Sequence, residues 1–198
     1  MEEQLIVGLG NPESDYAETR HNLGVECVQA LAARWQLPIK KKRWDSLVVH
    51  AEDHGAWLLL PQTFMNESGR AVARALRDTG VEPSAIWLVH DELDLPFCQM
   101  RISRDRSAAG HNGVRSVIDH VHTKNFARFR IGVGKPSGRG AAAGRHHVLG
   151  GFSRTEAREL DQVVGGVADA LELALASGLE RAMEKYNRAG ALGCEDAG

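Results

Sequence analysis

The sequence of 198 residues has only three cysteines and lacks any apolar run long enough to cross a membrane. Cys27, Cys98 and Cys194 lie far apart along the chain, which fits neither a disulfide framework nor a Cys-x-x-Cys metal site. A membrane-spanning helix needs about 20 consecutive apolar residues, and the longest run here, around 56–61, is far shorter. The first residues, 1–4, have neither the basic nor the apolar region of a signal peptide. We therefore expect a protein of the reducing cytoplasm.

The motifs of several common enzyme classes are also missing. Gly8-Leu9-Gly10 follows an apolar run, as in a dinucleotide-binding fingerprint, but Glu13 occupies the place of the third glycine. Lys135 is followed by proline, not by the Ser or Thr of a phosphate-binding loop. No serine lies in a Gly-x-Ser-x-Gly pattern, and adjacent His146 and His147 cannot both reach one metal from a strand. These absences argue against a dinucleotide enzyme, a P-loop enzyme and an elbow-type serine hydrolase.

Charge is unevenly distributed along the chain. The whole sequence has a net charge of −2, with apolar residues at 43% and charged residues at 25%, as in ordinary globular proteins. Segment 101–154 contains 11 Lys and Arg against two acids, a local charge of +9, so the rest of the chain is strongly acidic. Such asymmetry indicates a positive face for a polyanion, and arginine, the majority of these cations, suits phosphate. The alternative is a solvated basic face without a partner.

Apolar runs alternate with helical periodicities. The runs that predict strands are 5–9, 47–49, 57–60, 86–89, 100–103 and 129–133. The helices are expected from about 25 to 37, from 71 to Gly80, over 114–121, from 153 to 178 and over 179–186. Ser153 and Glu156 form a capping box at the start of the fourth helix. This order predicts a single α/β domain over 1–198 with a largely parallel or mixed sheet.

Three segments are expected to lack regular structure. The basic run 40–43 is interpreted as a solvated loop. Segment 132–151 has seven glycines in 20 residues, which predicts a long mobile loop. We expect the tail, 188–198, to be flexible.

Polar residues gather where the apolar strands end. Asn11 follows the first strand, Asn66 follows the hairpin, His90-Asp91-Glu92 ends the next strand, and His111-Asn112 precedes a helix. Thr19-Arg20-His21-Asn22 comes shortly after the first strand. Ligands of open α/β sheets bind beyond the carboxyl ends of the strands. A histidine with an aspartate partner is a general base, and asparagines can donate to a developing oxyanion.

Each of these residues also has a purely structural interpretation. Asparagines at strand ends are often turn formers, and a histidine before a helix is often a cap. Asp91, Glu92 and Asp94 could instead form a hard-metal cluster. Spacing alone therefore indicates a hydrolase or a polyanion-binding α/β domain.

At these same residues the sequence resembles the bacterial-type peptidyl-tRNA hydrolase family. The blocks that carry the resemblance are Gly8-Leu9-Gly10-Asn11-Pro12, Tyr16 with Thr19-Arg20-His21-Asn22, Pro61-Gln62-Thr63-Phe64-Met65-Asn66-Glu67-Ser68-Gly69, His90-Asp91-Glu92-Leu93-Asp94-Leu95-Pro96, Gly110-His111-Asn112-Gly113, Arg128-Phe129-Arg130-Ile131-Gly132-Val133-Gly134 and Val148-Leu149-Gly150. Any one block is weak, but seven in order over about 5–187 are a specific signature.

The resemblance implies cleavage of the ester between a peptide and the 3′ ribose of tRNA, so that tRNA is recycled for translation. It also implies a compact monomer without a cofactor, built on a mixed sheet flanked by helices on both faces. His21 matches the family's general base, Asp91 the carboxylate that keeps it basic, and Asn11 the residue that separates blocked from free aminoacyl-tRNA. Positions that contact the substrate or its pocket are matched by Tyr16, Phe64, Met65, Asn66, His111, Asn112 and Arg130.

The sequence departs from the family pattern near the expected tRNA clamp. Ser103 stands where a basic residue often holds a phosphate, so Arg101, Arg104 or Arg106 is expected to substitute for it. Phe97-Cys98 replaces a turn that usually contains glycine. Two other classes remain: a family member that binds RNA without turnover, and a metal-dependent phosphoesterase.

Overall fold

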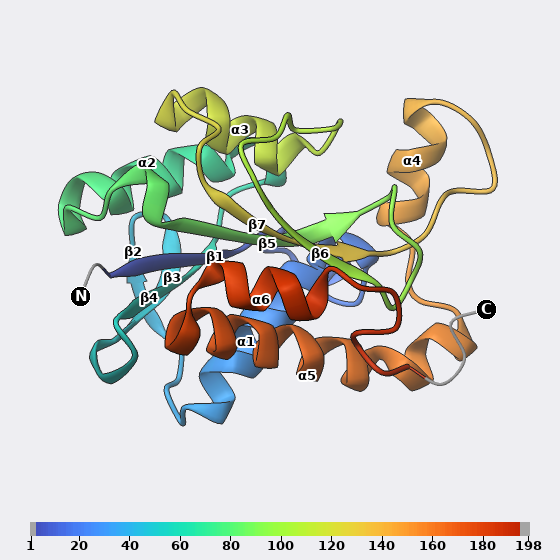
Figure 1. Ribbon diagram of the computed structural model, residues 1–198. Coiled ribbons are helices and arrows are strands. Elements are labelled where there is room, and N and C mark those ends of the chain that lie inside the picture. The colour runs from blue at the N-terminus through green and yellow to red at the C-terminus, as the bar shows by residue number, and fades with distance from the viewer. Residues whose placement is uncertain (1–2, 195–198) are drawn as a thin grey trace.

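The computed structural model describes residues 3–194, and its strands in that range form one seven-stranded sheet with the order β2-β3-β4-β1-β5-β7-β6 (Figure 1). The strands are β1 (Gln4–Gly8), β2 (Lys41–Arg43), β3 (Ser46–Ala51), β4 (Ala56–Pro61), β5 (Ile86–Glu92), β6 (Met100–Arg104) and β7 (Ala127–Gly132). The central strands β4, β1, β5 and β7 are parallel, whereas β2, β3 and β6 pair antiparallel at the two edges. The predicted mixed α/β sheet is confirmed.

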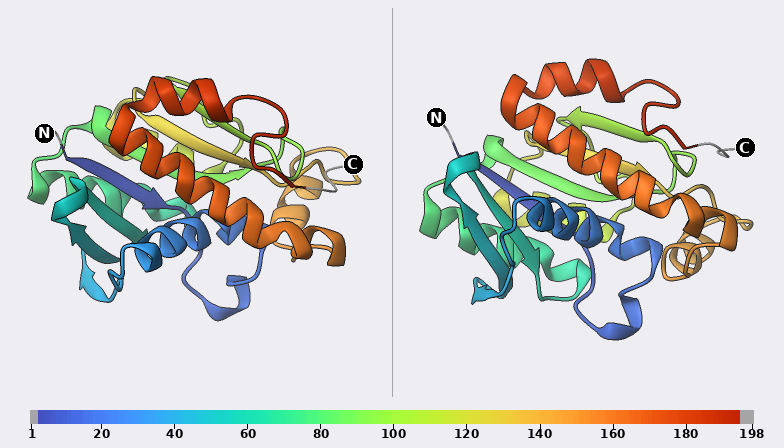
Figure 2. Two further views of the ribbon diagram at one scale, coloured as in Figure 1. Left: turned by 60° about the horizontal axis from the view of Figure 1, so that its bottom comes forward. Right: turned by 90° about the horizontal axis from the view of Figure 1, so that it is seen from below.

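Helices cover both faces of the sheet. They are α1 (Leu23–Arg34), α2 (Ser68–Thr79), α3 (Asn112–Val121), α4 (Ala141–Val148), α5 (Arg154–Ser177) and α6 (Leu179–Tyr186). The helices α2 and α3 lie on one face and α1, α5 and α6 on the other, while α4 stands beyond one end of the sheet (Figures 1 and 2). Successive strand side chains alternate between these layers: Ile6 belongs to the core under α1 and α5, and Leu5 and Val7 to the core under α2 and α3.

A close approach of backbones brings α1 onto the central strands. A Cβ atom on Gly24 would collide with the carbonyl oxygen of Val89 on β5, so only glycine permits this contact. Because Gly24 lies in the first turn of α1, this contact packs the start of the helix against the backbone of β5 and of Leu9, which follows β1.

Most predicted elements are confirmed. Gly80 ends α2 in the left-handed conformation, with φ 74°. The capping box is present at the start of α5. The Ser153 hydroxyl accepts from the Glu156 N–H, and the Glu156 carboxylate accepts from the Ser153 N–H.

Two predicted loops each contain a regular element. The glycine-rich segment 132–151 contains α4, because the alanines 141–143 favour helix more than the neighbouring glycines oppose it. The basic run 40–43 contains β2, an edge strand whose residues are all exposed, as charged edge strands commonly are.

The expectation that the cysteines form no disulfide is wrong. Cys98 and Cys194 form a disulfide with their Cα atoms 6.2 Å apart, and Cys27 is free and buried. The chain brings the two residues together by folding back after α6, a proximity that no spacing in the sequence reveals. The described part of the tail, 188–194, also packs: Leu192 is buried, and its carbonyl accepts from Gln162 at 2.8 Å.

Within 3–194, no helix is both long and apolar enough to cross a membrane.

Candidate active site

The functional candidates converge at the carboxyl ends of the four parallel strands. Asn11 follows β1, and Met65 lies in the short helix η4 (Met65–Glu67), which follows β4. Asp91 lies near the end of β5, and Arg130 lies near the end of β7. Parallel strands bring these ends to one edge of the sheet, where α/β proteins bind their ligands.

Asp91 is the buried centre of this site. It is 2% exposed. Its carboxylate lies 3.0 and 3.1 Å from Nδ1 of His21, and its Oδ1 lies 2.9 Å from Nε2 of His111. Burial alone would raise the pKa of Asp91, but the two histidines outweigh burial and hold that pKa well below its usual range. The carboxylate therefore stays ionised.

The bond to Asp91 determines which nitrogen of His21 is basic. An ionised carboxylate only accepts hydrogen bonds, so Nδ1 of His21 carries the proton and Nε2 keeps its lone pair. Burial lowers the pKa of His21, but the charge of Asp91 and the hydrogen bond to it raise the pKa above its ordinary value. The short helix η2 (Arg20–Asn22), which carries His21, is held in place by Arg20, whose guanidinium pairs with Glu156 of α5 at 2.8 Å.

His111 has the opposite tautomer, because it caps α3. Its Nδ1 accepts from the backbone N–H groups of Gly113 and Val114 at 3.2 and 3.3 Å. Nδ1 therefore has no proton, and Nε2 donates to Asp91. His111 is a fixed donor that stabilises the negative charge of Asp91.

These tautomers bear on metal binding. Donor atoms of His21, Asp91 and His111 lie within 4.8 Å of one another, the spacing of a possible metal site. A metal ion on Nε2 of His111 would leave the proton of the ring on Nδ1. Nδ1 could then no longer accept hydrogen bonds from the N–H groups of Gly113 and Val114. The residues do not fit a metal ion. The alternative cluster of Asp91, Glu92 and Asp94 fails as well, since Glu92 already binds Arg130 and the Asp94 N–H.

Asn11 is fixed by two neighbours. Asn22, which is 4% exposed, accepts from the Asn11 N–H and donates to the Asn11 carbonyl, both at 2.9 Å. The side-chain oxygen of Asn11 accepts from the N–H of Met65 at 2.9 Å. Among the described residues Nδ2 of Asn11 has no partner, so this side chain presents an N–H donor to the site.

Other predicted site residues form the rim. Phe64 is 52% exposed, unusually for so large an apolar side chain, whereas the next residue, Met65, is buried. Asn66 and Asn112 are exposed, and their side-chain amides have no hydrogen-bond partner in 3–194. Tyr16 is half-buried in the short helix η1 (Ser14–Tyr16).

Comparison with known proteins identifies the family of this chain. The sequence profile of the family described as peptidyl-tRNA hydrolase matches residues 5–192. The chain belongs to the peptidyl-tRNA hydrolase family. A family member from Trichodesmium erythraeum is 41% identical over 194 residues, covering 93% of this chain and 88% of the relative. Another, from Synechococcus sp. (strain JA-3-3Ab), is 42% identical over 187 residues, covering 93% of this chain and 82% of the relative.

Solved structures of the family show the same fold. The crystal structure of peptidyl-tRNA hydrolase from Acinetobacter baumannii at 1.00 Å resolution superposes with a TM-score of 0.86 and 32% sequence identity. The alignment covers 100% of this chain and 97% of that chain. The family, the fold and the enzyme class predicted from the sequence are confirmed.

The arginines of the basic segment have different surroundings. Arg128 is 2% exposed and donates to the backbone carbonyls of Arg106 and Ser107, so it holds the loop before α3. Arg130 is partly buried, and its Nε donates to Glu92 at 2.9 Å. Arg101 is exposed and lies opposite Arg130 in the β6–β7 ladder.

Sequence reasoning did not assign roles to two neighbours of the site. Asn22 directly follows His21, and that adjacency was the available signal. His90 is buried, donates from Nδ1 to the Asp91 carbonyl at 2.7 Å, and has its ring centroid 4.7 Å from that of His111. Burial and the nearby His111 lower the pKa of His90 well below its ordinary value, so it stays neutral.

Proposed function

We propose that this chain hydrolyses the ester between the peptide and the 3′ ribose of peptidyl-tRNA, with His21 as the general base. Family membership supports the reaction, and the Asp91 cluster supports the mechanism. The decisive observation is that Asp91 holds Nδ1 of His21 and is itself held by His111, which leaves Nε2 of His21 as a free basic atom at the site.

The hydrolysis uses one water molecule and needs no covalent nucleophile. Nε2 of His21 takes a proton from water as the oxygen attacks the ester carbonyl carbon. Asp91 stabilises the imidazolium that results. When the carbon–oxygen bond to the ribose breaks, the imidazolium returns the proton to the leaving 3′ oxygen. An ester is already activated, so neither a cofactor nor a metal is required.

Exposed amides supply the donors for the negative charge on the carbonyl oxygen. Asn66 and Asn112 follow Met65 and His111 in sequence, and Met65 and Gly113 pack together: a Cβ atom on Gly113 would collide with the sulfur of Met65. This packing holds the two asparagines at the same rim. Neither amide is used within 3–194, so both are available to a tetrahedral intermediate.

Asn11 selects substrates whose α-amino group is blocked. Its oxygen is occupied by the Met65 N–H, so it offers the donor Nδ2. A blocked amino group brings a carbonyl oxygen that can accept this bond. A free α-amino group at neutral pH is largely a cation, which a donor repels and leaves unpaired. Asn11 therefore discriminates through a donor rather than through its carbonyl.

The acceptor arm of tRNA binds across β6 and β7, and the structure favours Arg101 as the substitute for Ser103. Cross-strand partners point to the same face, so Arg101 lies beside Arg130. Arg130 is already paired with Glu92, whereas the side chain of Arg101 has no partner in 3–194 and is available to a phosphate. Arg104 shares the opposite face with Met100 and Ile102, which are buried under α5 and α6. We propose that the enzyme acts as a monomer in the cytoplasm, where its substrate forms.

An assay of N-blocked and free aminoacyl-tRNA tests this function. The parent enzyme should cleave only the blocked substrate efficiently. Asn11→Asp keeps an acceptor for the Met65 N–H but turns the remaining donor into a carboxylate oxygen that attracts a cation. The ratio of kcat/KM for free over blocked substrate should therefore rise at least about tenfold. Unchanged discrimination would show that selectivity lies elsewhere, and a parent without esterase activity would refute the function itself.

A further inference from the structure

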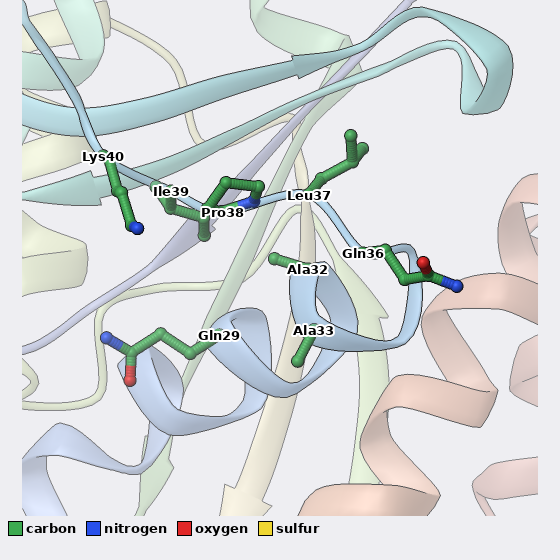
Figure 3. Close-up of a pocket in the computed structure, with 8 residues that line it drawn as sticks. All are labelled: Gln29, Ala32, Ala33, Gln36, Leu37, Pro38, Ile39 and Lys40. Carbon is green, nitrogen blue, oxygen red and sulfur yellow. The ribbon is translucent and has the colours of Figure 1, made fainter.

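Two hollows lie along α1, and neither is lined by the residues of the Asp91 cluster. The first, of about 230 Å³, begins at Asn11 and Asn22 and continues between Glu26 of α1 and Gln62 after β4. The second, of about 420 Å³, lies between the C-terminal half of α1 and the segment 37–40 (Figure 3). Gln29 lines both hollows, and we call the two together the α1 groove.

The helix determines the length of this groove. Glu26, Gln29 and Ala33 lie on one face of α1, at spacings of three and four residues, and Gln36 follows just beyond the end of the helix with φ 56°. From Glu26 to Gln36 the chain follows α1 and the turn that ends it, a rise of about 15 Å. An extended peptide advances about 3.3–3.6 Å per residue, so the α1 groove can hold four or five residues.

The walls suit a peptide backbone of any sequence. Gln29, Gln36 and Gln62 are exposed, and their amides can both donate to and accept from main-chain groups. The amide of Gln62 makes only long contacts of 3.4 Å to the neighbouring carbonyls, so it is free to turn to a ligand. In Figure 3 the small side chain of Ala32 faces the segment that carries Pro38 and Ile39, and Ala33 lies beside it on the same helix.

Two carboxyl groups line the first hollow, those of exposed Glu13 and half-buried Glu26, and the Glu26 carboxyl is only partly ionised near neutral pH. Burial, together with the charge of Glu18, raises the pKa of Glu26 to about 7. Around neutral pH its carboxyl group is protonated in much of the population and can donate to a peptide carbonyl. A fixed negative charge would favour cationic peptides, whereas this group accommodates neutral ones.

We propose that the α1 groove binds the peptide of the substrate, from the second residue counted from the ester to about the sixth. This inference rests on the proposed function, because it requires that Asn11 binds the first amide of the peptide. The position of the groove supports this occupant. Asn11 and Asn22 line its first hollow, and a peptide that extends beyond the first residue must pass these two residues.

Substrates of graded peptide length test the α1 groove. On a series of peptidyl-tRNAs from one N-acetylated residue to eight residues, KM of the parent should fall with length and level off near six residues, with kcat little changed. Ala33→Trp should fill the groove and abolish this dependence, without changing KM for N-acetyl-aminoacyl-tRNA. Ala176→Trp is the matched control, since Ala176 is also an exposed helical alanine but lies at the end of α5.

A milder variant guards against a folding defect in Ala33→Trp. Gln29→Ala removes one amide from the middle of the groove and should raise KM for the longest substrate about two- to tenfold, the usual worth of one hydrogen bond. A KM independent of length in the parent, or unaltered length dependence in both variants, would overturn the groove while leaving the proposed function intact. Failure of the parent to cleave the shortest blocked substrate would overturn the proposed function instead.

Discussion

The Asp91 cluster and the arginine surface of β6 and β7 differ in how their groups are held. Asp91 is 2% exposed and has both of its histidine partners within about 3 Å. Arg101 is exposed and unpaired in 3–194, and Arg130 shares its charge with Glu92. The buried Asp91 cluster acts in proton transfer, which requires particular nitrogen atoms in a particular protonation state, so no neighbouring residue can replace a lost member. An exposed arginine acts through charge, to which several residues contribute. Substitutions should therefore affect kcat in the first region and KM in the second.

The largest expected effect is that of His21→Ala. Without Nε2 no group at the site can take the proton from water, so kcat should fall about 10²- to 10⁴-fold, the usual worth of a general base. Affinity for a tRNA that carries an uncleavable peptide amide should change little. His54→Ala, an exposed histidine after β3, is the control. A variant that keeps more than about a tenth of the parent kcat would show that His21 is not the base.

Asp91→Asn should lower kcat and also shift its pH dependence. His21 acts as a base only when neutral, so activity is lost as the pH falls through its pKa. The carboxylate raises that pKa, so removing its charge should move the acidic limb of the pH–kcat profile to lower pH. Asp94→Asn changes an exposed carboxylate nearby and should move nothing. An unmoved limb in Asp91→Asn would mean that Asp91 and His21 are not coupled.

The smallest effects should come from Arg101→Ala and Arg130→Ala. Each should raise KM for full-length peptidyl-tRNA with kcat little changed. Each should also reduce the slope of the logarithm of the tRNA-binding constant against log[salt] by about 0.7–0.9 per lost phosphate contact. A peptide ester on a short 3′ fragment should be insensitive to both changes. Lys41→Ala, on β2 at the other edge of the sheet, is the control. A drop in kcat on the short fragment would place the arginine in the reaction site and remove the contrast between the two regions.

Sequence patterns were most informative where local forces dominate. The capping box at Ser153 and the left-handed Gly80 end their helices as expected, because both devices act within a few residues. The glycine count of 132–151 is misleading, because the run of three alanines at 141–143 is enough to start the helix α4. The basic run 40–43 became a strand, because pairing with β3 is a long-range choice that charge does not prevent.

The site could be predicted as a set of residues but not as a mechanism. The order of apolar runs brought Asn11, Asp91 and Asn66 to the strand ends, and the resemblance assigned their roles. Only the structure shows that Asn11 presents a donor, because its oxygen is taken by the backbone of Met65, 54 positions away. The structure alone likewise shows which arginine lies opposite Arg130, because that depends on the register of β6 against β7.

The sequence by itself determined the family, the alternation of strands and helices and the identity of the reacting groups, because these depend on residue type and on order along the chain. The tertiary structure decided the tautomers of His21 and His111, the donor face of Asn11 and the link between Cys98 and Cys194. Each of those properties depends on a partner many residues away, and such partners are set by the packing of the helices on the sheet.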